Sequence, residues 1–139
     1  MKVILNKQFG GFHPSPVAYM AYAKKCGFPL YAYKLNSFSR ENKYERQDVC
    51  DPKDNWVWFF KKDFGPAFSM TEEEFDEYYF SLGSDDREDP VLIEVVEELG
   101  EDASAYVSKL VVVEIPDGLD YTVDDYDGME TLHQKVKIW

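Results

Sequence analysis

The stretch that decides the fold is Val3-Ile4-Leu5-Asn6, followed by Lys7-Gln8-Phe9-Gly10-Gly11-Phe12-His13-Pro14 and then Ser15-Pro16. Its apolar start predicts a short buried strand. Two glycines and a proline predict a loop after it. Ser15 suits the N-cap of a helix and Pro16 its first helical position, while Gly27 suits its C-terminal end. The chain therefore opens as strand, glycine loop and helix. The stripe expected on the buried face of this helix consists of Val17, Met20, Ala21 and Lys24.

Further along the chain, local signals predict alternating helices and strands. Apolar runs predict strands at 29–35, 56–60 and 110–115, the second of them buried on both faces. Thr71 and Glu74 form a capping box, flanked by a hydrophobic staple of Met70 and Phe75, which predicts a helix to about residue 82. Asp89 predicts the cap of a second helix, which should run from residue 90 to 99.

The remaining segments are expected to be turns and short elements. The polar stretch 36–55 predicts a long irregular loop. The turn at 116–118 predicts a hairpin that returns as a strand at 121–123. A second turn is expected at 124–128, a helical turn at 129–134 and a strand at 136–139. The predicted fold class is α/β (α+β): a single compact domain, residues 1–139, with a mixed sheet of about five to six strands and two to three helices.

The composition favours a globular domain. The chain has 139 residues, of which 45% are hydrophobic and 17% aromatic, which is enough for a core. We expect no signal peptide and no membrane helix, because no segment approaches the roughly 20 apolar residues that a span needs. Two cysteines do not make a disulfide framework. Cys26 and Cys50 are therefore expected to be reduced, partly buried thiols in a reducing cytoplasm.

The charge is unevenly distributed along the chain. Residues 1–69 contain 11 Lys and Arg against 6 Asp and Glu, a net charge of +5, whereas residues 70–139 contain 4 against 21, a net charge of −17. An acidic surface repels nucleic acids and anionic membranes, so direct binding of either is not expected. A solvated face, a surface that competes with DNA for a basic partner, and head-to-tail association of unlike halves all remain open.

The glycine loop is the most suggestive candidate for a ligand site. Glycines let a backbone approach a ligand closely, and a helix N-terminus attracts anions such as phosphate. The loop matches neither GxxxxGK[ST] nor GxGxxG, so a simple chain turn is the alternative. Aromatic rings could stack a base and arginines could clamp a phosphate, although most rings must form the core. The rings considered are Tyr19, Tyr22, Tyr31, Tyr33, Trp56 and Trp58.

Catalytic and metal signatures are weak. The acidic turn at 125–128 lacks an oxygen ligand at Val123 and the bidentate glutamate, which is Gln134, so it is not an EF-hand. Glu130 and His133 have the spacing of a carboxylate–histidine metal motif, but only one copy occurs. No GxSxG motif is present. We therefore expect no cofactor, no metal and no catalytic residues.

Motifs near both ends of the chain carry a resemblance. They are Ile4-Leu5-Asn6-Lys7-x-Phe9-Gly10-Gly11-Phe12, then Asp89–Ile93 with Glu97–Gly100, and finally Val113–Gly118, Tyr126-Asp127-Gly128-Met129-Glu130 and Trp139. On these residues the chain resembles a family of small acidic bacteriophage-encoded proteins of unknown function. Relatives often end His-Arg-x-Trp, where this chain has Val136-Lys137-Ile138-Trp139, so a role for that arginine is not carried over. The resemblance implies a phage accessory protein in the host cytoplasm.

Three functions follow from these patterns. The first is a non-catalytic counter-defence protein that sequesters a small nucleotide-type ligand. The second is an acidic DNA mimic that inhibits a host defence nuclease or a restriction or CRISPR protein. The third is a hydrolase of a nucleotide signal that uses Glu130 or His133.

We rank ligand sequestration first. The expected partner is a small anionic ligand or a host defence protein, and the charge split favours a homo-oligomer. The candidate ligand-binding residues are Lys7, Phe9, Gly10, Gly11, Phe12, His13, Arg40, Arg46, Tyr126 and Trp139.

Overall fold

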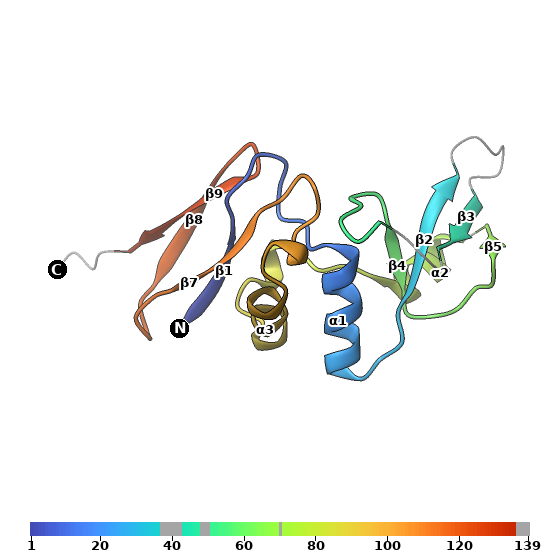
Figure 1. The fold of residues 1–139 in the computed structure, drawn as a ribbon, viewed down its shortest axis with the longest axis horizontal. Helices are drawn as coiled ribbons and strands as arrows, with labels where there is room; N and C mark the ends of the chain where they lie inside the picture. The colour runs from blue at the N-terminus through green and yellow to red at the C-terminus, as the bar shows by residue number, and fades with distance from the viewer. Residues whose placement is uncertain (37–42, 48–50, 70, 136–139) are drawn as a thin grey trace.

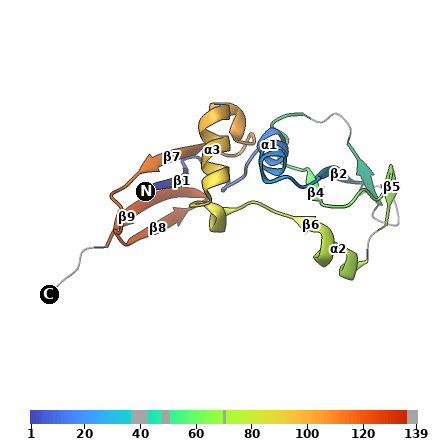
Figure 2. The same cartoon turned by 90° about the horizontal axis from the view of Figure 1, so that it is seen from below.

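Two β regions flank a central pair of helices in the computed structural model, which describes residues 1–36, 43–47, 51–69 and 71–135. Its helices are α1 (Pro16–Cys26), α2 (Glu72–Tyr78) and α3 (Pro90–Leu99), with short 3-10 helices η1 (Ser84–Asp86) and η2 (Gly100–Ala103). Figures 1 and 2 both show α1 and α3 side by side between the β regions. The predicted α/β (α+β) class is confirmed.

The strands of the described residues form three sheets. β5 (Ala67–Phe68), β3 (Lys43–Arg46), β2 (Tyr31–Asn36), β4 (Trp58–Phe60) and β6 (Tyr79–Phe80) lie in that order in a five-stranded sheet. Two further pairs are β1 (Lys2–Asn6) with β7 (Leu110–Glu114), and β8 (Tyr121–Tyr126) with β9 (Met129–Gln134).

Every pairing between these strands is antiparallel, so the sheet predicted as mixed contains no parallel pair in the part of the chain described. The physical reason is that α1 connects β1 and β2, which lie in different sheets and are not parallel neighbours joined by a crossover.

Strand β1 is buried on both faces, as its apolar run predicts. Ile4 packs with Leu92 and Val96 of α3 in one core cluster. Val3 and Leu5 point the other way and pack with Ile115 and with side chains of β8 and β9. Burying side chains of this size contributes roughly 1.5–3 kcal/mol each. The region therefore has three layers, which are the helices, the β1–β7 pair and the β8–β9 hairpin.

Helix α1 has the predicted ends but a different buried face. Ser15 is the N-cap and accepts a hydrogen bond from the Ala18 N–H, and Gly27 ends the helix at φ 81°. The predicted stripe is wrong, because Met20 is exposed whereas Ala18 and Ala23 are buried. Small alanines let α1 approach its neighbours closely. The adjoining rings Tyr19 and Tyr22 then reach partners on other elements, where their hydroxyls bond with Leu82 and Asp89.

Helix α2 confirms the capping box but ends early. Thr71 Oγ1 accepts from the Glu74 N–H, and the Glu74 side chain accepts from the Thr71 N–H. The helix stops at Tyr78 and does not reach residue 82. Tyr79 and Phe80 leave it to pair with β4 as strand β6. Pairing with an existing sheet edge and packing two aromatic rings outweigh continuation of a short helix.

The predicted loop at 36–55 contains a strand, because β3 pairs with both β2 and β5. The predicted strand at 56–60 is shorter than expected. Only Trp58–Phe60 form β4, whereas Trp56 is 78% exposed and lies in the preceding loop. The prediction that Trp56 belongs to a buried strand is therefore wrong.

The C-terminal part differs most from expectation. Strand β7 does not form the predicted hairpin with residues 121–123, because it pairs with β1 at the start of the chain. Residues 129–134 are not a helical turn but strand β9, which pairs with β8. Asp127 at φ 50° and Gly128 at φ 88° supply the two positive φ angles of a tight two-residue hairpin turn.

Some predictions fall on other parts of the chain. Cys50, Met70, and the expected strand at 136–139 lie outside the described residues. Cys26 is exposed, contrary to the prediction of a partly buried thiol, because the C-terminal end of α1 faces outward. Among the described helices, none combines the length and apolar character needed to cross a lipid bilayer.

Candidate ligand-binding cleft

The glycine loop packs against the turn of the β8–β9 hairpin. The Gly10 N–H donates to the Asp127 carbonyl oxygen at 2.9 Å. A Cβ on Gly128 would lie 2.1 Å from the Gly11 nitrogen, and one on Gly10 would lie 2.6 Å from the Val107 carbonyl oxygen. These approaches are too close for any side chain. The glycines therefore serve backbone-to-backbone packing, which explains why two distant motifs contain them.

Asn6 lies buried at the centre of this contact. Its Nδ2 donates to the carbonyl oxygens of Gln8 at 2.7 Å and Gly128 at 2.5 Å. Its Oδ1 accepts from the Ser108 hydroxyl at 3.1 Å and the Lys109 N–H at 2.9 Å. All four hydrogen-bonding positions of the Asn6 amide are used. No polar atom of this buried side chain is therefore left without a hydrogen-bond partner.

The buried Glu130 forms an ion pair with the half-buried Arg87 beside Asn6. Glu130 is 3% exposed. Its Oε2 accepts from Arg87 Nη2 at 2.7 Å, and its Oε1 accepts from Arg87 Nη1 at 3.1 Å and from the Asn6 N–H at 2.8 Å. Arg87 also donates to the Ile4 carbonyl oxygen and packs over the Phe12 ring. We call residues 6–13, 125–130 and Arg87 the loop–hairpin contact.

Four of the ten sequence candidates stabilise this contact. Lys7 Nζ donates to the Glu130 carbonyl oxygen at 2.8 Å. Phe9 and Tyr126 pack edge to face with ring centroids 6.2 Å apart. Gly10 makes the close approach to Val107 described above. These four residues, which the sequence suggests as ligand contacts, thus make contacts within the protein.

The remaining candidates are divided. Gly11, Phe12 and His13 line a cleft beside α1. Arg46 pairs with Asp63 at 2.7 Å and lies over the Tyr31 ring in the five-stranded sheet, so it does not join them. Arg40 and Trp139 lie outside the described residues.

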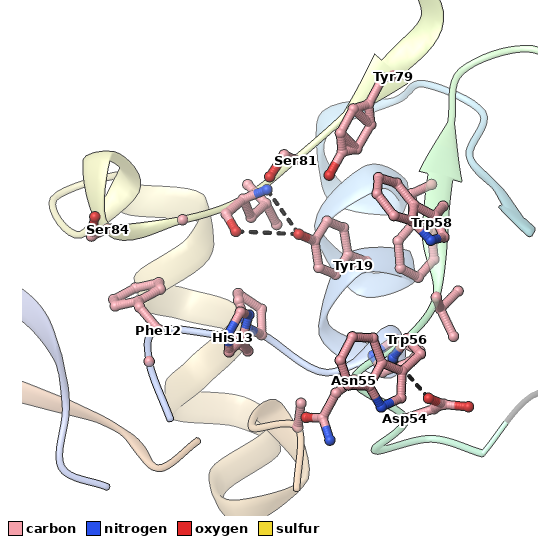
Figure 3. Close-up of a pocket in the computed structure, with 18 of the residues that line it drawn as sticks. Phe12, His13, Tyr19, Asp54, Asn55, Trp56, Trp58, Tyr79, Ser81 and Ser84 are labelled. Atoms are coloured by element: carbon pink, nitrogen blue, oxygen red, sulfur yellow. Dashed lines mark hydrogen bonds between the residues drawn. The ribbon is translucent and has the colours of Figure 1, made fainter. Parts of the chain in front are cut away.

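The cleft is about 550 Å³ in volume, which is within the range of small-molecule sites. It lies where the glycine loop, the start of α1, the segment before β4 and the segment after β6 meet (Figure 3). Its lining includes Phe12, His13, Pro14, Pro16, Tyr19, Asp54, Asn55, Trp56, Val57, Trp58, Phe59, Tyr79, Ser81 and Ser84. Six of these residues carry aromatic rings other than imidazole, which gives the cleft several flat apolar walls.

Tyr19 is the most firmly held of these rings. It stacks on Phe59 with centroids 4.3 Å apart and planes within 7°. Its hydroxyl donates to the Leu82 carbonyl oxygen at 3.2 Å and accepts from the Leu82 N–H at 2.9 Å. Burial raises the pKa of Tyr19, and the Leu82 hydrogen bond opposes that rise only in part. The phenol therefore stays neutral and fixed, as a wall of the cleft.

Trp56 stands at the opposite extreme because its side chain is mostly in solvent. Its backbone N–H donates to Asp54 Oδ1 at 2.8 Å, and Asp54 Oδ2 pairs with Lys34. Burial alone would raise the pKa of Asp54, but the hydrogen bonds from Lys34 and Trp56 and the Lys34 charge lower it overall. The ionised carboxylate anchors the loop that carries Trp56 at the rim of the cleft.

Glu130 and His133, which have the spacing of a metal motif, do not lie together as a catalytic or metal centre. Glu130 is buried, whereas His133 is exposed and its Nε2 lies 2.9 Å from Asp124. Residues three apart on a strand point to opposite faces, so the spacing of a helical motif does not bring them together on β9. Within the described ranges no three His, Cys, Asp or Glu side chains are grouped as metal ligands.

Sequence reasoning missed several cleft residues. Tyr79 and Ser81 fall in the helix predicted to about residue 82, which ends at Tyr78 in the structure. Asp54 and Asn55 lie in the stretch predicted as an irregular loop, but an Asp side chain often accepts a hydrogen bond from the backbone two residues on, as Asp54 does from the Trp56 N–H. That pattern was the available signal for an ordered Trp56 loop.

Comparison with known proteins identifies no relative whose functional site could be transferred to this chain. No protein-family model, no curated protein and no solved structure matches the chain.

Proposed function

We propose that this protein is a non-catalytic binding protein that captures a small nucleotide-type ligand by enclosing its planar base in the aromatic cleft. The observation that carries the proposal is the set of rings around one cavity, with Tyr19 and Phe59 as a rigid wall and Trp56 free at the rim. Base–aromatic stacking contributes about 1–3 kcal/mol per base. Such a site retains a ligand without transforming it.

The biological setting of the proposal comes from the resemblance to phage-encoded proteins. In that setting the protein acts in the host cytoplasm as a counter-defence factor and removes a signal molecule. The anionic ligand predicted from the sequence is not part of this proposal, since the candidate cations Lys7 and Arg46 are engaged elsewhere.

The decisive experiment is native mass spectrometry and calorimetry with nucleosides and with linear and cyclic nucleotides. Trp56→Ala should weaken binding about five- to 150-fold, since it removes one stacking ring. Its stability should be unchanged because the ring is exposed. The matched control is Tyr126→Ala, which removes an equally exposed ring that does not line the cleft. Absence of any adduct, or equal affinity of Trp56→Ala and wild type, would contradict the proposal.

The acidic inhibitor remains a second candidate. Exposed carboxylates on α2, among them Glu72, Glu73 and Glu77, favour it because they concentrate negative charge on one element. It predicts inhibition of a DNA-binding enzyme that weakens steeply with salt. Inhibition unaffected by salt would argue against it.

A further inference from the structure

The aromatic cleft differs in charge from a phosphate site. Among the described residues that line it, none is a lysine or an arginine, while Asp54, Asp125 and Glu130 are carboxylates. A phosphate is normally held by arginine, lysine or a helix N-terminus that is free to donate. At the start of α1 the Ala18 N–H is already taken by Ser15. The cleft therefore offers an anion little compensation for lost hydration.

Three cations that contact lining residues are already engaged. Arg87 is paired with Glu130 at 2.7 Å, and Lys34 is paired with Asp54. Lys7 donates to the Glu130 carbonyl oxygen at 2.8 Å. Recruiting Arg87 or Lys34 for a ligand would leave a buried or half-buried carboxylate without its partner, which is costly.

Asp125 is the lining carboxylate without a cationic partner in the described part of the chain. Its Oδ1 accepts from the Gly128 N–H at 2.7 Å as part of the hairpin turn. Its side chain is exposed. Its neighbour Asp124 is also exposed but lies beside His133 and does not line the cleft. Of these two adjacent carboxylates, Asp125 therefore lines the cleft and Asp124 does not.

We propose, on the basis of the capture function above, that the planar group entering the cleft carries a positive charge, as a protonated or N-alkylated heteroaromatic base does. Tryptophan and tyrosine faces attract cations, and Trp56, Trp58 and Tyr79 supply such faces. Asp125 adds a full negative charge at the cleft. The net charge of −12 adds a long-range field that draws cations to the molecule.

The test compares three ligands with one ring system, using calorimetry on the full chain at neutral pH. The probes are 1-methyladenosine, which is cationic, adenosine, which is neutral, and adenosine monophosphate, which is anionic. We expect 1-methyladenosine to bind about three- to thirty-fold tighter than adenosine, and the monophosphate to bind more weakly than adenosine. Equal affinities, or tightest binding of the monophosphate, would overturn the inference.

A pair of variants assigns the charge effect to one side chain. Asp125→Asn keeps an acceptor for the Gly128 N–H but removes the charge, so it should reduce the preference for 1-methyladenosine while leaving adenosine affinity unchanged. Asp124→Asn is the matched control and should keep the full preference. An unchanged preference in Asp125→Asn would overturn the role of that carboxylate.

The charge inference and the capture function can fail separately. Binding of adenosine that depends on Trp56 but shows no preference for the cation would overturn the charge inference and leave the capture function standing. If none of the three probes, and no nucleotide, binds in a Trp56-dependent way, the capture function is overturned and the charge inference with it.

Discussion

The two β regions on either side of α1 and α3 are stabilised by different kinds of interaction. In the loop–hairpin contact, a buried amide and a buried ion pair satisfy specific backbone groups. In the five-stranded sheet, rings pack around Phe60, which contacts Tyr33, Phe68, Phe75 and Tyr79. The first arrangement tolerates few substitutions, because each atom has an assigned partner. The second tolerates more, because apolar contacts are numerous and non-directional.

The comparison bears on function because the cleft lies where the two regions meet. Phe12 and His13 come from the first region, and Trp58 and Tyr79 come from the second (Figure 3). A ligand would therefore contact both. Ligand binding should therefore weaken when either region is destabilised, and the variants below measure how strongly single side chains stabilise each region.

The largest effect is expected from Glu130→Ala. The change leaves the half-buried Arg87 guanidinium without its carboxylate and the Asn6 N–H without its acceptor. Loss of one partner of a buried pair costs about 3–5 kcal/mol in the free energy of unfolding. Urea denaturation measures this. Glu130→Gln, which keeps an acceptor for the Asn6 N–H, should lose less. A cost for Glu130→Ala as small as that of an exposed residue would show that the contact is not tightly specified.

Gly128→Ala should be next. The residue has φ 88°, and its new Cβ would lie 2.1 Å from the Gly11 nitrogen, so both backbone strain and a clash oppose the change. Strain of this kind costs about 1–3 kcal/mol before the clash is added. Gly118→Ala is the control, since Gly118 has φ 77° with nothing within 4 Å of its Cβ position. Thermal denaturation should place Gly128→Ala well below Gly118→Ala, and equal melting temperatures would contradict the close approach.

Tyr33→Phe should have a moderate effect in the aromatic region. The hydroxyl accepts from the Phe64 N–H at 3.0 Å and donates to the Gly65 carbonyl oxygen at 3.1 Å, and the residue is fully buried. Removing it leaves two backbone groups without a partner and should cost about 1–2 kcal/mol by urea denaturation. Tyr126→Phe, whose ring is 76% exposed, should cost nothing measurable. Indistinguishable variants would mean that ring packing alone stabilises the region.

The smallest effect is expected at Asp54. Its pKa in the folded protein is lowered from 3.8, so its ionised form contributes stability above that value, and the contribution is lost as pH falls through the lowered folded pKa. Asp54→Asn should therefore be less stable than wild type by about 0.5 kcal/mol near neutral pH. At an acidic pH well below 3.8 the difference between the two proteins should be smaller, because the wild-type carboxyl is progressively protonated as the pH approaches its lowered pKa. Urea denaturation at both pH values tests this, and a difference that persists in acid would contradict the assigned ionisation.

Sequence patterns predict the structure correctly where the interactions that determine it lie within one short segment. The caps of Ser15, Thr71 and Asp89 placed the starts of all three described α-helices, because a side chain three residues from a free N–H acts within its own turn. The burial of β1 followed from its apolar run. The Asp127-Gly128 pair is an equally local hairpin signal, and it predicts the turn between β8 and β9, whereas the helical turn predicted at 129–134 is wrong.

Pairing partners and the site itself were decided by contacts between distant segments. β7 pairs with β1 across more than a hundred residues, and the same separation joins Asn6 to Gly128 and Glu130. Nothing in the spacing along the chain shows that the glycine loop would be closed by a hairpin turn rather than left open for a phosphate. The sequence likewise does not show that the Trp56 ring lies in solvent. Strand β4 consists only of Trp58–Phe60, so Trp56 lies outside the sheet.

The sequence by itself determined the class of the fold, the helix starts, the buried first strand and the acidic character of the second half. Each of these depends on residues that are neighbours along the chain or on composition alone. The tertiary structure decided which strands pair, which face of α1 is buried, which candidate side chains are consumed by internal contacts and where a cleft remains. These depend on segments brought together only by folding, since burial and close approach are properties of the packed chain and not of any single segment.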